Sequence, residues 1–205
     1  MLIYVIRHGQ TDWNAEGRLQ GQKDIPINAI GRGQATRNGE TLRDLVGSAD
    51  GFDFVASPLS RTRETMERVR TAMGLDPMGY RTDERLRELS FGDWEGFTTA
   101  EIKKSVPERL RERSKNKWSF IPPGPDAESY EILSWRIGAW LASLKGPTIS
   151  VSHGGVLRSL FRIIGNVDEN EAANMPIHQD RIVRIEMHDS EAKDGAAAKS
   201  TIAWI

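Results

Sequence analysis

Two histidines stand where a short apolar run gives way to polar residues. The run 2–6 ends at Arg7 and His8, and the run 147–152 ends at His153. Buried parallel strands have this pattern, and the carboxyl ends of neighbouring strands meet at one edge of a sheet, where α/β folds bind their ligands. We therefore expect both imidazoles at one site.

The residues beside these histidines suit a phosphate group. Arg7 precedes His8, and Arg61 follows the apolar run 52–56 at another strand-to-helix junction. A phosphomonoester dianion carries close to two charges, and guanidinium groups bind its oxygens in pairs, so that a metal ion becomes unnecessary. The chain has no cysteine, which leaves a neutral imidazole as the natural nucleophile. We interpret His8 as the acceptor of a phosphoryl group, forming a transient phosphohistidine, and expect neither a metal nor a cofactor.

The same chemistry needs groups that donate protons and hydrogen bonds. His153 would donate hydrogen bonds to the equatorial phosphoryl oxygens. The leaving alkoxide needs a proton and the incoming water must lose one, so one carboxyl group can act first as the acid and then as the base. Glu88 is the best-placed candidate, ahead of Asp83, Glu84 and Glu95. For each candidate the alternative is structural: a histidine at a strand end, a surface ion pair or a solvated loop charge.

Four motifs in chain order resemble those of the histidine phosphatase superfamily, also called phosphoglycerate mutase-like. They are Arg7 to Asn14 with Leu19 to Gly21 and Pro26 to Asn28, then Ser57 to Thr62, Glu88 to Gly96, and Val151 to Arg158. Many members carry leucine where this chain has Ile27, a mild departure. The Arg-His-Gly triplet is a weak signal by itself, but the ordered set is specific and spans residues 1–165.

The resemblance implies a role for each matching residue. The implied catalytic residues are His8 as nucleophile, Glu88 as proton donor, and Arg7, Arg61 and His153 as the phosphate pocket. The residues implied to bind substrate are Gly9, Thr11, Asn14, Gln20, Gly21 and Gly154. For Asn14, Gln20 and Gly21 a plain role in turns is the alternative.

One departure separates two branches of the family. Bisphosphoglycerate-dependent mutases resembling this chain carry a longer insertion after the acid and follow the last histidine with Gly-Asn, whereas here Gly154 and Gly155 follow His153. This favours a phosphomonoesterase acting on a small phosphorylated metabolite. A 2,3-bisphosphoglycerate-dependent mutase is the alternative, and a non-catalytic phospholigand-binding module is a third. The basic run 109–117, together with 103–104, is either a solvated helix face or a site for an anionic substrate tail.

Strands alternating with helices must position these residues. Strands are expected at 2–6, 52–56, 77–82, 147–152, 181–187 and 201–205. Helices are expected at 31–46, 61–73 with Ser60 as its cap, from Thr98 with a capping box to Glu101, from about Pro107, and at 128–144, 156–164 and 167–174. The polar segment that follows the first strand, through Asn14, Gly17 and Gly21 to Asn28, is expected to form a loop. The last two strands are expected to form a hairpin across 190–200. This order predicts a three-layer α/β/α sandwich, with a mostly parallel central sheet and an antiparallel edge strand.

Length and composition limit the other possibilities. A chain of 205 residues fits one domain, 1–205, with an insertion or lid at about 98–125. The net charge of −1 argues against nucleic acid or an anionic membrane as partner. The opening apolar run is too short for a secretory signal or a membrane span. Absence of cysteine fits a reducing cytosol, so we expect a cytoplasmic protein. The oligomeric state is unreadable, and a homodimer stays open.

Overall fold

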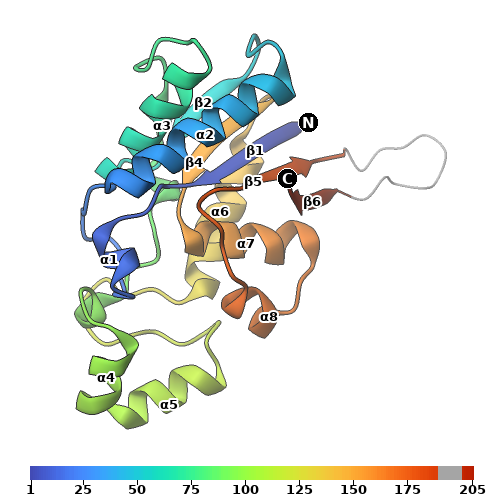
Figure 1. Ribbon diagram of the computed structural model, residues 1–205. Coiled ribbons are helices and arrows are strands. Elements are labelled where there is room, and N and C mark those ends of the chain that lie inside the picture. The colour runs from blue at the N-terminus through green and yellow to red at the C-terminus, as the bar shows by residue number, and fades with distance from the viewer. Residues whose placement is uncertain (189–199) are drawn as a thin grey trace, which may run out of the picture.

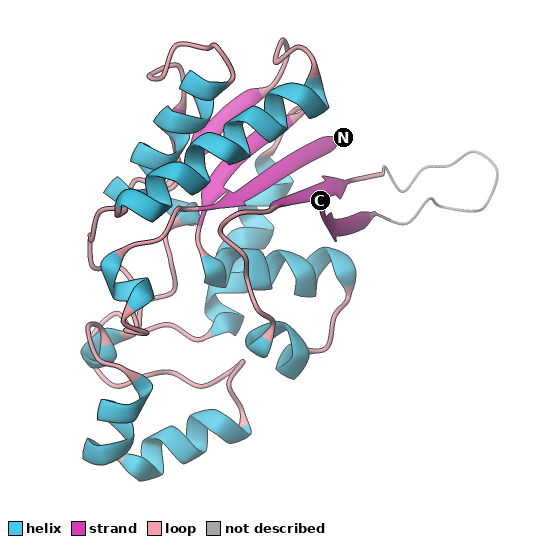
Figure 2. Ribbon diagram, in the orientation of Figure 1, coloured by secondary structure: helices cyan, strands magenta, loops and turns pink. Residues whose placement is uncertain are grey.

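A six-stranded sheet forms the centre of the described part of the protein. The computed structural model describes residues 1–188 and 200–205, so most of the predicted connection 190–200 lies outside the described residues. The strands are β1 (Leu2–Arg7), β2 (Asp53–Ala56), β3 (Arg81–Thr82), β4 (Thr148–Ser152), β5 (Ile182–Glu186) and β6 (Thr201–Trp204). Their order is β3-β2-β4-β1-β5-β6, as the fan of strands in Figure 2 shows. The pairs among β1 to β4 are parallel, and β5 pairs antiparallel with both β1 and β6.

Helices cover both faces of this sheet, which confirms the predicted three-layer α/β/α sandwich (Figure 1). Strand β1 explains why two covers are needed, because its buried residues alternate between the faces. Ile3 and Val5 pack with residues of α6 (Tyr130–Ser143) and α7 (Gly154–Gly165). Tyr4 and Ile6 pack with residues of α2 (Ala29–Val46) and α3 (Ser60–Ala72). Both faces of the strand are apolar, so each requires its own helical layer.

The helices lie close to where the sequence predicts them. They are α1 (Asp12–Ala15), α2 (Ala29–Val46), α3 (Ser60–Ala72), α4 (Thr99–Ser105), α5 (Pro107–Lys115), α6 (Tyr130–Ser143), α7 (Gly154–Gly165) and α8 (Glu169–Asn174), with 3-10 turns at Glu84–Leu86 and Gly92–Trp94. The predicted capping box at the start of α4 is confirmed, since Thr98 and Glu101 bond each other's backbone N–H groups. Pro107 begins α5 as expected.

Two local predictions are wrong. Ser60 does not cap α3: Leu59 occupies that position without a side-chain bond, and the Ser60 hydroxyl instead donates to Asp24 at 2.7 Å. The loop after β1 contains a short helix, α1, because Thr11 forms a capping box with Asn14. The short strand expected within 77–82 is present as β3, which covers only Arg81–Thr82.

Helices α4 and α5 lie below the carboxyl ends of the strands in Figure 1, away from the sheet itself. They make up most of the 98–125 segment, whose role as a lid stays a prediction. Within residues 1–188 and 200–205, no helix combines the length and the apolar character that crossing a membrane requires.

Candidate active site

The register of β1 and β4 brings the two predicted histidines together. Arg7 pairs with Ser152 at the end of this parallel ladder, so His8 and His153 follow at the same height. The His8 backbone N–H donates to the Ser152 carbonyl at 2.9 Å. Their rings meet edge to face with centroids 5.2 Å apart. The expectation of one site for both imidazoles is therefore met by the geometry.

His8 is held in one orientation and one tautomer. Its Nδ1 lies 2.8 Å from the Gly9 carbonyl oxygen, and because a carbonyl only accepts, Nδ1 carries the proton. The lone pair is left on Nε2. Burial, and then the charges of Arg61 and Arg7, hold the pKa of His8 well below its usual value, so the ring is neutral at pH 7. A neutral imidazole with a free Nε2 has the form that a nucleophile needs.

The depressed pKa of His8 predicts a pH-dependent stability. The unfolded chain takes up a proton near its ordinary pKa of about 6.5, whereas the folded protein does not, so the free energy of unfolding falls as the pH drops below that value. Replacing His8 with glutamine removes this term. We expect the wild type to lose about 1.4 kcal/mol more than the variant over the range from about pH 7.5 to about pH 5.5, measured by urea unfolding. Equal pH dependence in the two proteins would contradict a buried neutral His8.

His153 is oriented by Ser57, a residue that the sequence analysis did not single out. Strand β2 lies beside β4, and the Ser57 hydroxyl lies 2.7 Å from His153 Nε2. The other ring nitrogen, Nδ1, is buried and has no partner among the described residues. Burial is also the main cause of the strongly lowered pKa of His153, with the charge of Arg61 next. His153 Nδ1 therefore has a hydrogen-bonding capacity that no described residue uses.

Arg7 and Arg61 bring two buried guanidinium groups to the same place. Arg7 donates to the Ile177 carbonyl at 2.7 Å, and Arg61 donates to the carbonyls of Gly21 and Lys23. Burial lowers the pKa of each arginine to about 10, so both stay charged at pH 7. Their Nε atoms are buried without a partner among the described residues. Buried charges with unused donors are costly unless an anion pairs with them.

Glu88 faces this arrangement from the loop after the first 3-10 turn. Its carboxylate accepts the Gly155 N–H at 3.0 Å and the Leu89 N–H at 2.9 Å. A Cβ on Gly155 would lie 2.3 Å from Glu88 Oε1, so only glycine admits the carboxylate there. Of the four acidic candidates, Glu88 alone lines the cavity described next, whereas Asp83 pairs with Arg85.

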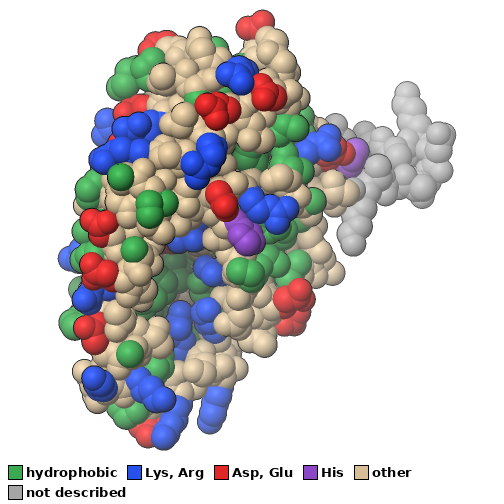
Figure 3. Space-filling model, viewed as in Figure 1, with side chains coloured by type: hydrophobic (Ala, Val, Ile, Leu, Met, Phe, Trp, Pro, Cys, Tyr) green, Lys and Arg blue, Asp and Glu red, His purple; other side chains and the backbone are tan. Residues whose placement is uncertain are grey.

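A cavity of about 140 Å³ opens over His8. Its lining includes eight of the predicted residues: Arg7, His8, Asn14, Gln20, Gly21, Arg61, Glu88 and Gly154. Figure 3 shows this face hollowed, with Lys and Arg side chains around the hollow. Among the described residues, no group of three or more His, Cys, Asp or Glu side chains is placed to hold a metal ion.

Three predicted residues lie outside the cavity lining. His153 lies behind it against His8. Gly9 packs on α2 so closely that a Cβ would lie 2.3 Å from the Gly31 carbonyl oxygen. The Thr11 hydroxyl is buried and donates to Gln20 at 2.9 Å. Gly9 and Thr11 therefore support the loop that carries the site, and their contact with substrate stays a prediction.

Comparison with known proteins agrees with this geometry. A family model described as histidine phosphatase superfamily (branch 1) matches residues 3–193. The chain belongs to the histidine phosphatase superfamily. The probable phosphoglycerate mutase GpmB of Citrobacter koseri is 36% identical over 200 residues, which cover 92% of this chain and 86% of that protein. This histidine phosphatase family member is therefore an enzyme of the phosphoryl-transfer or phosphate-hydrolysis type.

Solved structures share its fold. A mycobacterial glucosyl-3-phosphoglycerate phosphatase superposes with a TM-score of 0.75 at 27% identity, covering 90% of this chain and 89% of that one. Bacillus stearothermophilus YhfR has a TM-score of 0.76 at 29% identity, covering 90% of each chain. These neighbours confirm the predicted fold class.

Six residues of this histidine phosphatase line the cavity without having been predicted to do so: Arg18, Leu19, Phe91, Tyr130, Gly155 and Arg158. Arg158 lies one helical turn beyond Gly154, and that spacing places both on the same face of α7. The spacing was therefore a usable signal. Tyr130 enters from the first turn of α6, where its hydroxyl lies 3.4 Å from Arg158. No local pattern marks Tyr130, because its place depends on how α6 packs against α7.

Proposed function

We propose that this protein is a phosphomonoesterase that hydrolyses a small phosphorylated metabolite through a phosphohistidine on His8. The observation that carries the proposal is a neutral imidazole with a free Nε2 between two buried arginines, with a carboxylate on the facing wall. Each part has a separate task in phosphoryl transfer, which is chiefly positioning and charge stabilisation.

The reaction would proceed in two displacements. His8 Nε2 forms a bond to phosphorus while the bond from phosphorus to the ester oxygen breaks, and protonated Glu88 gives its proton to the leaving alcohol. Water then attacks phosphorus, Glu88 takes up a proton from it, and the P–N bond breaks to release phosphate. Arg7, Arg61 and His153 Nδ1 would stabilise the phosphoryl oxygens in both steps, because they are donors already fixed in a buried site. We expect activity without a metal ion, and insensitivity to a chelator tests this.

A cationic cluster supports a substrate with a second anionic group. Arg158 lines the cavity, and Lys117 and Arg113, at the end of α5, lie near enough for their charges to interact with that of Arg158. Burial and the neighbouring charges of Arg113 and Arg158 lower the pKa of Lys117 to about 7. Among the described residues, none of the three forms an ion pair, while Arg109 and Arg111 nearby each pair with a glutamate. Both GpmB and the mycobacterial phosphatase carry phosphoglycerate in their names, and glycerate is a carboxylate.

Lys117 gives this substrate class a direct test. Glycerol 3-phosphate carries a hydroxymethyl group at the position where 3-phosphoglycerate carries a carboxylate. In Lys117→Met we expect KM for 3-phosphoglycerate to rise about tenfold and KM for glycerol 3-phosphate to change little, because one charge-assisted contact is lost. In the wild type the preference for the carboxylate should weaken as the pH rises through about 7. Lys145→Met, at an exposed position before β4, is the control, and equal KM changes for the two esters would contradict the assignment.

A mutase is the second candidate, favoured by the similarity to GpmB. The two functions share one pocket and differ in whether water reaches the phosphohistidine. Steady release of inorganic phosphate from a panel of phosphomonoesters, with no primer added, supports the phosphatase. Turnover that appears only with a bisphosphorylated primer, and without net phosphate release, would overturn it in favour of the mutase.

A further inference from the structure

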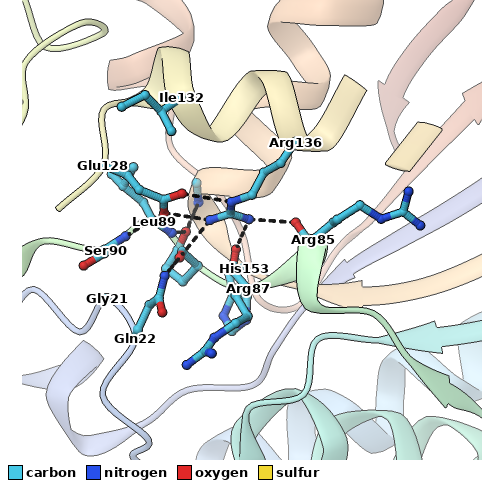
Figure 4. Close-up of polar contacts among 12 residues, drawn as sticks. Gly21, Gln22, Arg85, Arg87, Leu89, Ser90, Glu128, Ile132, Arg136 and His153 are labelled. Atoms are coloured by element: carbon cyan, nitrogen blue, oxygen red, sulfur yellow. Dashed lines mark hydrogen bonds and ion pairs between the residues drawn. The ribbon is translucent and has the colours of Figure 1, made fainter. Parts of the chain in front are cut away.

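One arginine outside the cavity lining donates hydrogen bonds to the backbone around Glu88 and to a neighbouring carboxylate. Arg136, in the middle of α6, donates from Nη1 to the carbonyls of Arg85 and Arg87, both at 2.7 Å, and from Nη2 to the carbonyl of Glu88 at 3.2 Å. Its remaining donors bind the Glu128 carboxylate at 3.0 and 2.8 Å. Figure 4 shows the guanidinium group among these acceptors. All five N–H donors of the arginine are thus used.

Glu128 extends this grip to the other side of the acid. Its carboxylate accepts the Ser90 N–H at 3.1 Å, and its own N–H donates to the Ser90 carbonyl at 3.0 Å. Gln22 adds a bond from its side-chain amide to the Glu88 carbonyl at 3.1 Å. The backbone is therefore fixed before, at and after Glu88, although this stretch belongs to no sheet or helix.

The backbone held by this clamp, which Arg136 and Glu128 form, is also joined to the histidine side of the site. The Ser152 hydroxyl, next to His153, donates to the Leu86 carbonyl at 2.9 Å. The Glu88 carboxylate itself is bound to the N–H of Gly155 at the start of α7. The acid and the two imidazoles are thus linked through β4 and α7, while α6 supplies the rigid support behind the acid. A loop residue that must reach an ester oxygen needs such support, because displacement by about 1 Å costs roughly 100-fold in rate.

We propose that Arg136, paired with Glu128, is a positioning residue that holds Glu88 in reach of the leaving-group oxygen. The inference rests on the proposed function of Glu88 as proton donor. Lysine would not replace this arginine, because a single ammonium group cannot span three carbonyls and a carboxylate. The arginine does not itself touch the cavity. Its charge also contributes to the lowered pKa of His153, and a lysine at this position would keep that charge.

The test compares two esters that differ in their need for a proton. Departure of p-nitrophenolate needs little help, whereas the alkoxide of 3-phosphoglycerate must be protonated as it leaves. In Arg136→Lys and Glu128→Gln we expect the first-turnover rate of alcohol release from 3-phosphoglycerate to fall roughly 10- to 100-fold, and that from p-nitrophenyl phosphate to fall less than about threefold. Adding Arg136→Lys to Glu88→Gln should produce little further loss. Initial release of the alcohol is measured, so the comparison holds whether phosphatase or mutase chemistry follows.

Equal losses of alcohol release from the two esters would overturn the inference. So would a loss from Arg136→Lys that multiplies the loss from Glu88→Gln. Either result would assign the pair a purely structural role. Arg81→Lys is the matched control: Arg81 forms a two-pronged pair with Asp53 on the exposed side of β3, so its loss should leave the ratio between esters unchanged. Should Arg136→Lys not fold, Glu128→Gln keeps the shape of the pair and gives the same readout. If the wild-type protein releases alcohol from neither ester, the proposed function itself is refuted. That result is distinct from equal losses in the variants, which refute only the role of Arg136 and Glu128.

Discussion

Replacing His8 with alanine is expected to lower kcat for every phosphomonoester by about 10⁴-fold or more, because the variant has no atom to accept the phosphoryl group. The remaining arginines would still bind the dianion, so the loss should appear in kcat much more than in KM. Initial-rate kinetics and detection of an acid-labile phosphoenzyme provide the measurement. The phosphoenzyme should be trapped in the wild type and be missing from the variant.

The control for this prediction is His178→Ala. His178 is exposed and stacks edge-on against Trp204, away from the cavity lining. Its replacement should leave both kcat and the phosphoenzyme near their wild-type levels. A His8→Ala protein that keeps activity within about tenfold of the wild type would rule out a covalent intermediate on this residue.

Glu88→Gln is expected to lower the first-turnover rate of alcohol release from 3-phosphoglycerate by about 10³-fold and to change that from p-nitrophenyl phosphate far less. Glutamine keeps the size of the side chain and one acceptor for the Gly155 N–H, but it cannot give a proton to the leaving oxygen. Alcohol release in the pre-steady state reports this first step directly.

The second step should be affected for both esters. The attacking water must lose a proton to Glu88, so a phosphoenzyme made from either substrate should persist in the variant. Glu84→Gln, at the exposed neighbouring acid, is the matched control and should behave as the wild type. Equal loss of alcohol release from the two esters would mean that Glu88 has a structural task and some other group supplies the proton.

The two predictions separate roles that the cavity geometry alone groups together. In the proposed mechanism His8 forms the covalent bond and is required for every substrate, whereas Glu88 matters in the first step in proportion to the basicity of the leaving group. The Arg136 and Glu128 variants should follow the pattern of Glu88→Gln at smaller size. Variants of Lys117 should follow neither pattern, because the change is expected in KM and only for substrates with a second anion.

Much of the site was predictable because the relevant signals are local or follow from a parallel sheet. The apolar runs that end at Arg7 and at His153 predict two strand ends, and parallel pairing sets such ends side by side. The same reasoning holds for Arg61 in the first turn of α3. Where local signals conflicted with distant contacts they failed, as at Ser60, whose hydroxyl binds Asp24 instead of capping the helix.

The amino-acid sequence by itself determined the candidate nucleophile, the arginines, the candidate acid and the sandwich that carries them, because residue type and strand periodicity already encode those features. Only the tertiary structure decided the tautomer of His8, the bond from Ser57 to His153, and the entry of Tyr130 into the cavity. It alone also revealed the clamp of Arg136 and Glu128 on the backbone of the acid. These depend on which side chains meet when α6 and α7 pack against the sheet, and hydrogen bonds between residues tens of positions apart leave no periodic trace in a sequence.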